Sequence, residues 1–215
     1  MRIDEPISQQ SWTPWLYDDR RTLGELCACL PGDAATEVPW YVRLLENPRS
    51  PLALAGAVDL FSHDCIHLLL GRGLLPQDEA FVLGFTLGTS AGRRRWHARL
   101  LGFCARYLYQ SSYRFSDLDH DVFHYAVAQG RTSKVLPLDD VAFRALIDQP
   151  LALVRARIGV SSRLLSEVYR GERLRWPHTA ASQRLRPGFD GLPLYGPADP
   201  REHVANAASV GRSPR

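Results

Sequence analysis

Two histidines four residues apart, His63 and His67, lie in the segment HDCIHLLLGRGLLPQDE, and Glu79 follows the second histidine after eleven residues. Side chains at positions i and i+4 of a helix lie on one face, so both imidazoles can reach the same point. Asp64 is rotated by one residue and can reach the edge of that point. Two imidazoles with one or two carboxylates suit a divalent metal ion, Zn²⁺, Fe²⁺, Co²⁺ or Mn²⁺, and leave coordination positions open.

Asp59 lies one turn before His63 and can orient that imidazole as an acceptor outside the coordination sphere. The same residues also have a purely structural interpretation. Two histidines at this spacing can belong to an ordinary amphipathic helix, and a glutamate in the first turn of a helix stabilises its macrodipole. Spacing alone leaves both interpretations open.

A second HDxxH pattern occurs at His120, Asp121 and His124, but Leu136 stands where the first pattern has its glutamate. The pattern can be a coincidence on a surface or core helix. It can instead approach the first site and add a ligand or a second metal ion. A third interpretation is a diverged metal-dependent phosphohydrolase built on His–Asp pairs. One bound ion per chain would favour coincidence, and two would favour the others.

Helical periodicity dominates the chain, and no alternating strand pattern is convincing, so the sequence predicts an all-α fold. The Gly71–Gly73 break would let the two ligand-bearing helices fold back antiparallel. Helices are expected at about 22–30, 37–46, 51–70, 76–91, 93–111, 117–129, 139–147, 151–159 and 164–173. We predict a single helical domain: an N-terminal segment 1–36, a metal-binding helical domain 37–175, and a flexible tail 176–215 rich in Pro, Gly, Ser and Ala.

Composition excludes several classes of protein. Among 215 residues, 45% are hydrophobic and 23% are charged, as in ordinary globular domains, and a net charge of +3 is too small to indicate nucleic-acid binding. No stretch approaches the roughly 18 apolar residues of a membrane span, and we do not expect the acidic N-terminal stretch to act as a secretory signal. Four cysteines without CxxC pairing suggest reduced, buried thiols. We expect a cytoplasmic protein that is soluble or lies on a membrane surface.

Two features of the predicted helices concern lipid. The helix at 93–111 carries Arg95, Trp96, Arg99 and Phe103. Its apolar side can pack into the core, with the arginine stems lying along it, or can enter an anionic bilayer surface. Gly84 and Gly88 recur at a spacing of four on the helix that carries Glu79. They indicate either close helix–helix packing or a smooth groove for an isoprenoid chain beside the metal.

The first motif, HDxxH followed by eleven residues and Glu, resembles the signature of the coenzyme Q biosynthesis protein four family. A second stretch, GRTSKVLPLDDVAFRALIDQPLALVRARIGV, resembles the closing segment of that family, so the resemblance covers roughly residues 37–160. It implies an all-α protein at membrane surfaces, with His63, Asp64, His67 and Glu79 as metal ligands. Ile66 departs from the family, which often has an aromatic residue there, and nothing after residue 175 resembles it.

The resemblance implies a component of ubiquinone biosynthesis, located in the cytoplasm and peripheral to the inner membrane face. Its activity would be metal-dependent decarboxylation and hydroxylation at ring carbon one of a polyprenyl benzoate. The expected partners are an isoprenoid lipid, the membrane surface and other quinone-biosynthesis enzymes; a homodimer is left open. One alternative is a non-catalytic lipid-binding scaffold that organises those enzymes. Another is the metal-dependent phosphohydrolase.

Overall fold

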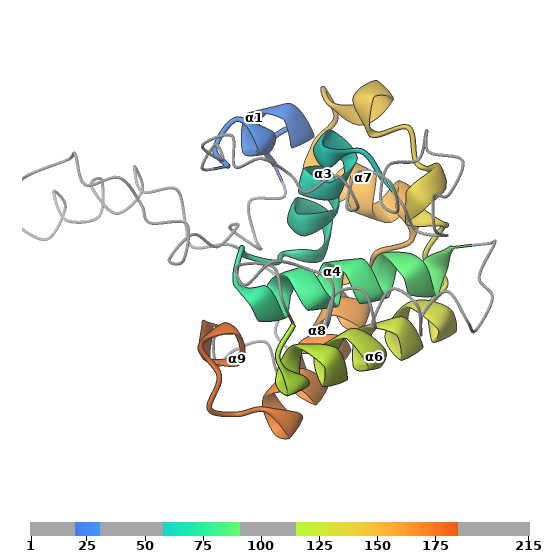
Figure 1. Ribbon diagram of the computed structural model, residues 1–215. Coiled ribbons are helices and arrows are strands. Elements are labelled where there is room, and N and C mark those ends of the chain that lie inside the picture. The colour runs from blue at the N-terminus through green and yellow to red at the C-terminus, as the bar shows by residue number, and fades with distance from the viewer. Residues whose placement is uncertain (1–19, 31–57, 91–114, 185–215) are drawn as a thin grey trace, which may run out of the picture.

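The computed structural model describes residues 20–30, 58–90 and 115–184 (Figure 1). Within these ranges the regular elements are helical, and the one β interaction is an isolated bridge between Thr22 and Pro150. The predicted all-α class is therefore confirmed. The helices expected at 37–46 and 93–111 lie outside the described residues.

The α-helices follow one another along the chain, and two short 3₁₀ turns separate α6 from α7. Their bounds are α1 Leu23–Cys27, α3 Leu60–Leu70, α4 Pro76–Thr89, α6 Asp117–Thr132, η1 Leu138–Asp140, η2 Phe143–Leu146, α7 Leu151–Ile158, α8 Ser162–Arg175 and α9 Ala180–Arg184. In Figure 1, α4 runs between α3 on one side and α6 on the other, with α8 behind. The helix expected over 139–147 is instead the two 3₁₀ turns, and α8 is longer than expected at both ends.

The start of α3 differs from the expectation of a continuous helix over 51–70. Asp59 has extended backbone geometry (φ −70°, ψ 161°) and caps the helix, because its Oδ1 accepts a hydrogen bond from Ser62 N at 2.8 Å. An acceptor on the N-cap satisfies one of the amide groups that a helix start leaves unpaired. At the other end Gly71 takes the left-handed conformation (φ 65°), so α3 stops there and the chain turns towards α4.

The predicted flexible tail is wrong for residues 176–184. Trp176 caps the end of α8, and α9 begins at Ala180 after a short turn. Ala181 and Ser182 are buried, and the Ser182 hydroxyl accepts a hydrogen bond from the Gln77 side-chain amide at 3.2 Å. This segment therefore packs on the start of α4, and composition alone could not indicate that contact. The rest of the predicted tail lies outside the described residues.

Glycines bring α4 and α6 into backbone contact. A Cβ atom added to Gly84 would collide with the Phe123 carbonyl oxygen, and one added to Gly88 would lie 2.5 Å from that of Val127 and 3.0 Å from Gly130 Cα. Gly130 is part of α6, which continues past the end expected at 129. Gly84 and Gly88 therefore serve helix packing, and the alternative of an isoprenoid groove lined by these two glycines is wrong.

A buried ion pair holds the turn between α3 and α4. Arg72, 1% exposed, donates to both carboxylate oxygens of Glu172 on α8, at 2.9 and 2.5 Å. The guanidinium also lies 3.5 Å from the centroid of the Phe81 ring. Beside it, the Tyr169 hydroxyl donates to the Leu70 carbonyl, and the Gln77 amide donates to Glu172 at 2.6 Å. The charges are paired and hydrogen-bonded, as burial in a low-dielectric interior requires.

A second arginine ties α7 to the end of α3. Arg155, 5% exposed, donates from Nε to the Leu69 carbonyl at 2.9 Å and from Nη2 to the Leu68 carbonyl at 3.2 Å. The last carbonyls of a helix have no partner within it, and a cation there also complements the helix dipole. Arg155, which lies in the second family-like stretch, thus stabilises the end of the helix that carries His63 and His67.

Replacing Gly88 by alanine should destabilise the protein. Alanine gains about 1 kcal/mol of helix propensity over glycine, whereas forcing a methyl group against the α6 backbone costs about 1–3 kcal/mol. We expect the loss to win, because the clash at Gly88 is with main-chain atoms that cannot rotate away. Urea unfolding would measure the difference. Ala128→Ser adds one heavy atom on the exposed side of α6 and should change stability by less than about 0.5 kcal/mol; equal losses in both variants would contradict the packing argument.

Replacing Arg72 by methionine should cost about 3–5 kcal/mol, because it leaves the buried Glu172 carboxylate unpaired. The double variant Arg72→Met/Glu172→Met removes both charges and should regain more than half of that loss. Denaturant unfolding of the two variants and the parent checks this. If the double variant is less stable than Arg72→Met, the ion pair is not what makes the single change costly.

Candidate metal centre

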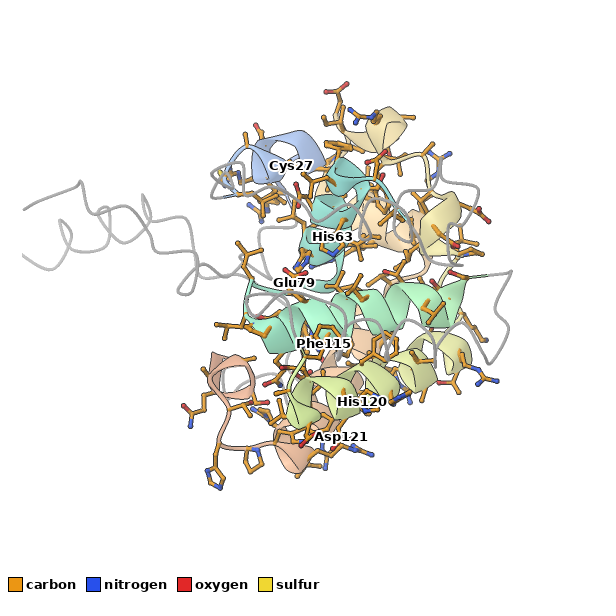
Figure 2. The ribbon with its side chains drawn as sticks, viewed as in Figure 1. Cys27, His63, Glu79, Phe115, His120 and Asp121 are labelled. Carbon is orange, nitrogen blue, oxygen red and sulfur yellow. The ribbon has the colours of Figure 1, made fainter. Side chains whose placement is uncertain are left out.

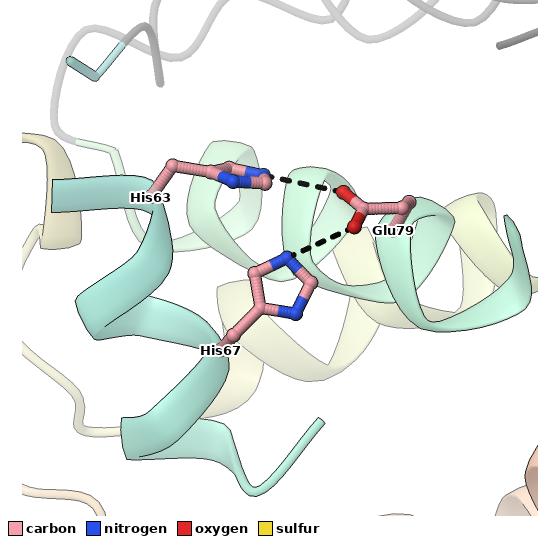
Figure 3. Close-up of side chains that lie close together, drawn as sticks. All are labelled: His63, His67 and Glu79. Carbon is pink, nitrogen blue, oxygen red and sulfur yellow. Dashed lines mark ion pairs between the residues drawn. The ribbon is translucent and has the colours of Figure 1, made fainter. Parts of the chain in front are cut away.

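Three side chains from α3 and α4 converge on one point (Figure 3). His63 and His67 lie one turn apart on α3, with ring centroids 4.7 Å apart. Glu79, in the first turn of α4, lies between them. Its Oε1 is 3.3 Å from His67 Nε2 and its Oε2 is 3.5 Å from His63 Nε2. The convergence predicted from spacing is therefore present.

The cluster has a buried side and an accessible side. The side chain of His67 is 1% exposed, whereas those of His63 and Glu79 are 20% and 33% exposed. A metal ion held at this point would therefore contact protein on the His67 side. Solvent or a ligand could reach the ion past His63 and Glu79. This is the arrangement of an open site rather than of a closed structural one.

A backbone carbonyl fixes the ring of His67. His67 Nδ1 lies 2.8 Å from the Gly73 carbonyl oxygen, and since a carbonyl only accepts, Nδ1 carries the hydrogen. In a neutral ring this leaves the Nε2 lone pair directed at Glu79. Nε2 is itself buried without a hydrogen-bond partner of good geometry. A buried nitrogen of this kind needs a partner, and a bound cation could be that partner.

Electrostatics distinguish the two imidazoles. Burial lowers the pKa of His63 to about 4, against the opposing effect of Glu79, so this ring is neutral near pH 7. Burial by itself would lower the pKa of His67, but the Glu79 carboxylate and the Gly73 carbonyl raise it above its usual value. Burial would likewise raise the pKa of Glu79, yet the two imidazoles, His67 foremost, hold it at about 2. Glu79 is thus ionised, and a metal ion could bind two nitrogens and a carboxylate by displacing the hydrogen that the raised pKa favours on His67 Nε2.

The separations place candidate ligand atoms of three side chains close to one another. Ligand atoms at about 2.0–2.1 Å from a tetrahedral ion lie roughly 3.3–3.4 Å from one another. The two histidine–glutamate separations, 3.3 and 3.5 Å, are close to that value, and they involve different oxygens of the Glu79 carboxylate. All three ligand atoms lie within 4.8 Å of one another, and the described residues contain no other such group of three His, Cys, Asp or Glu residues. The cluster could therefore hold a metal ion.

Asp64 is not part of this cluster, although the family resemblance implies it as a ligand. Its charge acts instead on Cys27 and Cys65. Cys65 is buried, and its Sγ lies 3.6 Å from Cys27 Sγ on α1, so this side of α3 faces α1 and not α4. The burial expected of the thiols is present at Cys65, whereas Cys27 is half-buried, Cys29 is exposed and Cys104 lies outside the described residues.

Asp59 does not play the predicted orienting role within the described residues. Its carboxylate caps α3 through Ser62, and the acceptor that orients an imidazole is the Gly73 carbonyl on His67. Sequence reasoning missed Gly73 because a carbonyl carries no residue-type signal. Only the glycine-rich break after α3 pointed to this part of the chain.

The second HDxxH pattern does not join the first. His120 and Asp121 lie on α6, which packs against the side of α4 opposite α3, and Figure 2 shows them apart from His63 and Glu79. His120 Nε2 and His124 Nε2 lie 3.2 Å apart at an exposed position. Within the described residues, the interpretation in which this pattern adds a ligand to the first cluster is therefore wrong.

The residues expected at a membrane surface, Arg95, Trp96, Arg99 and Phe103, lie outside the described residues. Among the helices described, none has the length and apolar character that crossing a bilayer demands. Comparison of the chain with protein-family models, with curated proteins and with solved structures found no match.

Glu79→Gln should abolish or strongly weaken metal binding while leaving the helices formed, because an amide keeps the shape of the carboxylate but not its charge. In the unchanged protein, an ion at a hundred times its dissociation constant should raise the free energy of unfolding by about 2.7 kcal/mol. Metal analysis and thermal unfolding with and without ion measure both effects. Glu167→Gln, at the exposed pair with Arg163, is the matched control; equal metal content in both variants would contradict the assignment.

Proposed function

We propose that this protein acts in ubiquinone biosynthesis, where one divalent ion held by His63, His67 and Glu79 serves decarboxylation and hydroxylation at ring carbon one of a polyprenyl benzoate. The ion would be Zn²⁺, Fe²⁺, Co²⁺ or Mn²⁺, which two imidazoles and a carboxylate suit. The observation that carries the proposal is the meeting of these three side chains, in the order and spacing of the family motif, at a point with an accessible side.

The proposed reaction replaces the ring carboxyl group by a hydroxyl group. The bond between ring carbon one and the carboxyl carbon breaks, carbon dioxide leaves, and a carbon–oxygen bond forms at the same position. With dioxygen as the oxygen source, its second atom leaves as water. A reductant of the protein's surroundings then supplies two electrons, accompanied by two protons.

The three residues of the cluster would have different roles in the site. A bound divalent ion supplies a Lewis acid for the carboxylate and phenolic oxygens of the ring, or a centre for oxygen activation. His67, fixed by the Gly73 carbonyl, forms the buried wall of the site. His63 and Glu79 form its accessible rim, so the ring would enter past them. The charge of Glu79 also limits the net positive charge presented to the substrate carboxylate.

The isoprenoid tail of such a substrate would come from a bilayer, which makes a position at the cytoplasmic face of the membrane part of the proposal. The other quinone-biosynthesis enzymes would be its partners there. With Gly84 and Gly88 occupied by packing against α6, the lipid would be received by other parts of the chain.

The purified full-length protein, reloaded with each of the four ions in turn, should release labelled carbon dioxide from a carboxyl-labelled prenylated 4-hydroxybenzoate when dioxygen and a reductant are present. Glu79→Gln should lower this release at least tenfold, because it removes the charged ligand, and Glu167→Gln should leave it unchanged. Scintillation counting of the released gas and mass spectrometry of the hydroxylated ring measure the two products.

Two outcomes would contradict the catalytic proposal. Binding of the prenylated benzoate with no release of carbon dioxide under any ion would favour the lipid-binding scaffold instead. Release that persists in Glu79→Gln would place the chemistry elsewhere. Phosphate release from model esters that Glu79→Gln abolishes would favour the phosphohydrolase.

A further inference from the structure

The second histidine pair lies on a rigid element. α6 is 16 residues long and begins with a capping box in which the Ser116 hydroxyl and the Asp119 carboxylate each accept from the other's backbone amide. Its inner side contacts the α4 backbone directly at Gly88 and Gly130. The helix therefore fixes the positions from which His120 and His124 project, and only their side-chain torsions are free.

The two imidazoles are already directed at one another. His120 Nε2 and His124 Nε2 are 3.2 Å apart, with ring centroids 4.5 Å apart and ring planes at 78°. The ring of Phe123, a buried residue, lies 5.4 Å from that of His124 in an edge contact and restrains its rotation. In the metal-free protein, one Nε2 hydrogen can be shared between the two rings.

This separation is also that of two nitrogens on one metal ion. At metal–nitrogen distances of about 2.0–2.1 Å, ligands at 90° lie roughly 2.9 Å apart and ligands at a tetrahedral angle roughly 3.4 Å apart. The observed 3.2 Å falls between these limits. An ion could thus replace the shared hydrogen with no movement of the backbone.

The surroundings make this a different kind of site from the cluster on α3 and α4. His124 is exposed and His120 half-buried, and the neighbouring Asp121 faces solvent. No third His, Cys, Asp or Glu of the described residues forms a ligand group with this pair. The remaining coordination positions would therefore face solvent.

We propose that His120 and His124 form a second, solvent-open binding site for a borderline transition-metal ion, Cu²⁺, Ni²⁺ or Zn²⁺, completed by water or an external ligand. With only two nitrogen ligands it binds more weakly than the three-residue cluster. Because no carboxylate takes part, it should prefer Cu²⁺ and hardly retain Mn²⁺, following the usual affinity order of nitrogen sites. The site is independent of the proposed enzymatic function.

Titration calorimetry of the full chain without an affinity tag tests the proposal, with Cu²⁺ as the probe. Relative to the unchanged protein, His124→Gln and His120→Gln should each bind one ion fewer. His178→Gln changes a single exposed histidine on the segment between α8 and α9 and should bind as many ions as the parent. All three positions lie outside the α3–α4 cluster, so thermal unfolding of the metal-free variants should match the parent.

The double variant His63→Gln/Glu79→Gln separates this site from the first, because Glu79→Gln alone would leave His63 and His67 as a second pair of imidazoles able to bind Cu²⁺. In that background, Cu²⁺ electron paramagnetic resonance should show nitrogen hyperfine coupling from two imidazoles, which the further change His124→Gln should abolish. Unchanged stoichiometry in both His120→Gln and His124→Gln would overturn the proposal and leave the pair as a histidine–histidine hydrogen bond. Failure of the first site would appear differently, as an unchanged stoichiometry in His63→Gln/Glu79→Gln alone.

Discussion

The ion pair between Arg72 and Glu172 is the constraint on which the candidate centre depends. It joins the turn after α3 to α8, a hundred residues further along the chain, and it is enclosed by Phe81 and Tyr169. Burying two charges is expensive unless each has an opposite charge and hydrogen bonds beside it, so losing either partner would be costly. The turn it holds contains Gly73, whose carbonyl sets the ring of His67. The position of the ligand nitrogen thus follows from a contact far from it in sequence.

The local part of the candidate site could be predicted from sequence, because helix geometry alone places His63 and His67 on one face and a short turn returns Glu79 to them. Asp64 could not be placed in the same way. One residue turns a helix by about 100°, and whether a side chain there reaches the site depends on what packs against that side. Here α1 does, with Cys27 against Cys65.

Some sequence patterns have two possible physical causes. Glycines at a spacing of four fit both an open groove and a close helix crossing, and only the presence of α6 decides between them. Similarly, the composition after residue 175 is typical of a mobile segment, yet two small residues near its start, Ala181 and Ser182, are buried. Asp59 was expected inside a helix, whereas the extended backbone at that residue makes it a cap.

The contacts of Arg155 bear on how such a centre could be transferred to another scaffold. Its guanidinium occupies the carbonyls at the end of α3, so the histidine-bearing helix is completed by a residue almost ninety positions downstream. A helical hairpin copied from residues 59–90 alone would carry every candidate ligand and still lack the cation that terminates its first helix. The smallest portable unit of this centre is therefore discontinuous, and an engineer would have to graft α7 together with the hairpin.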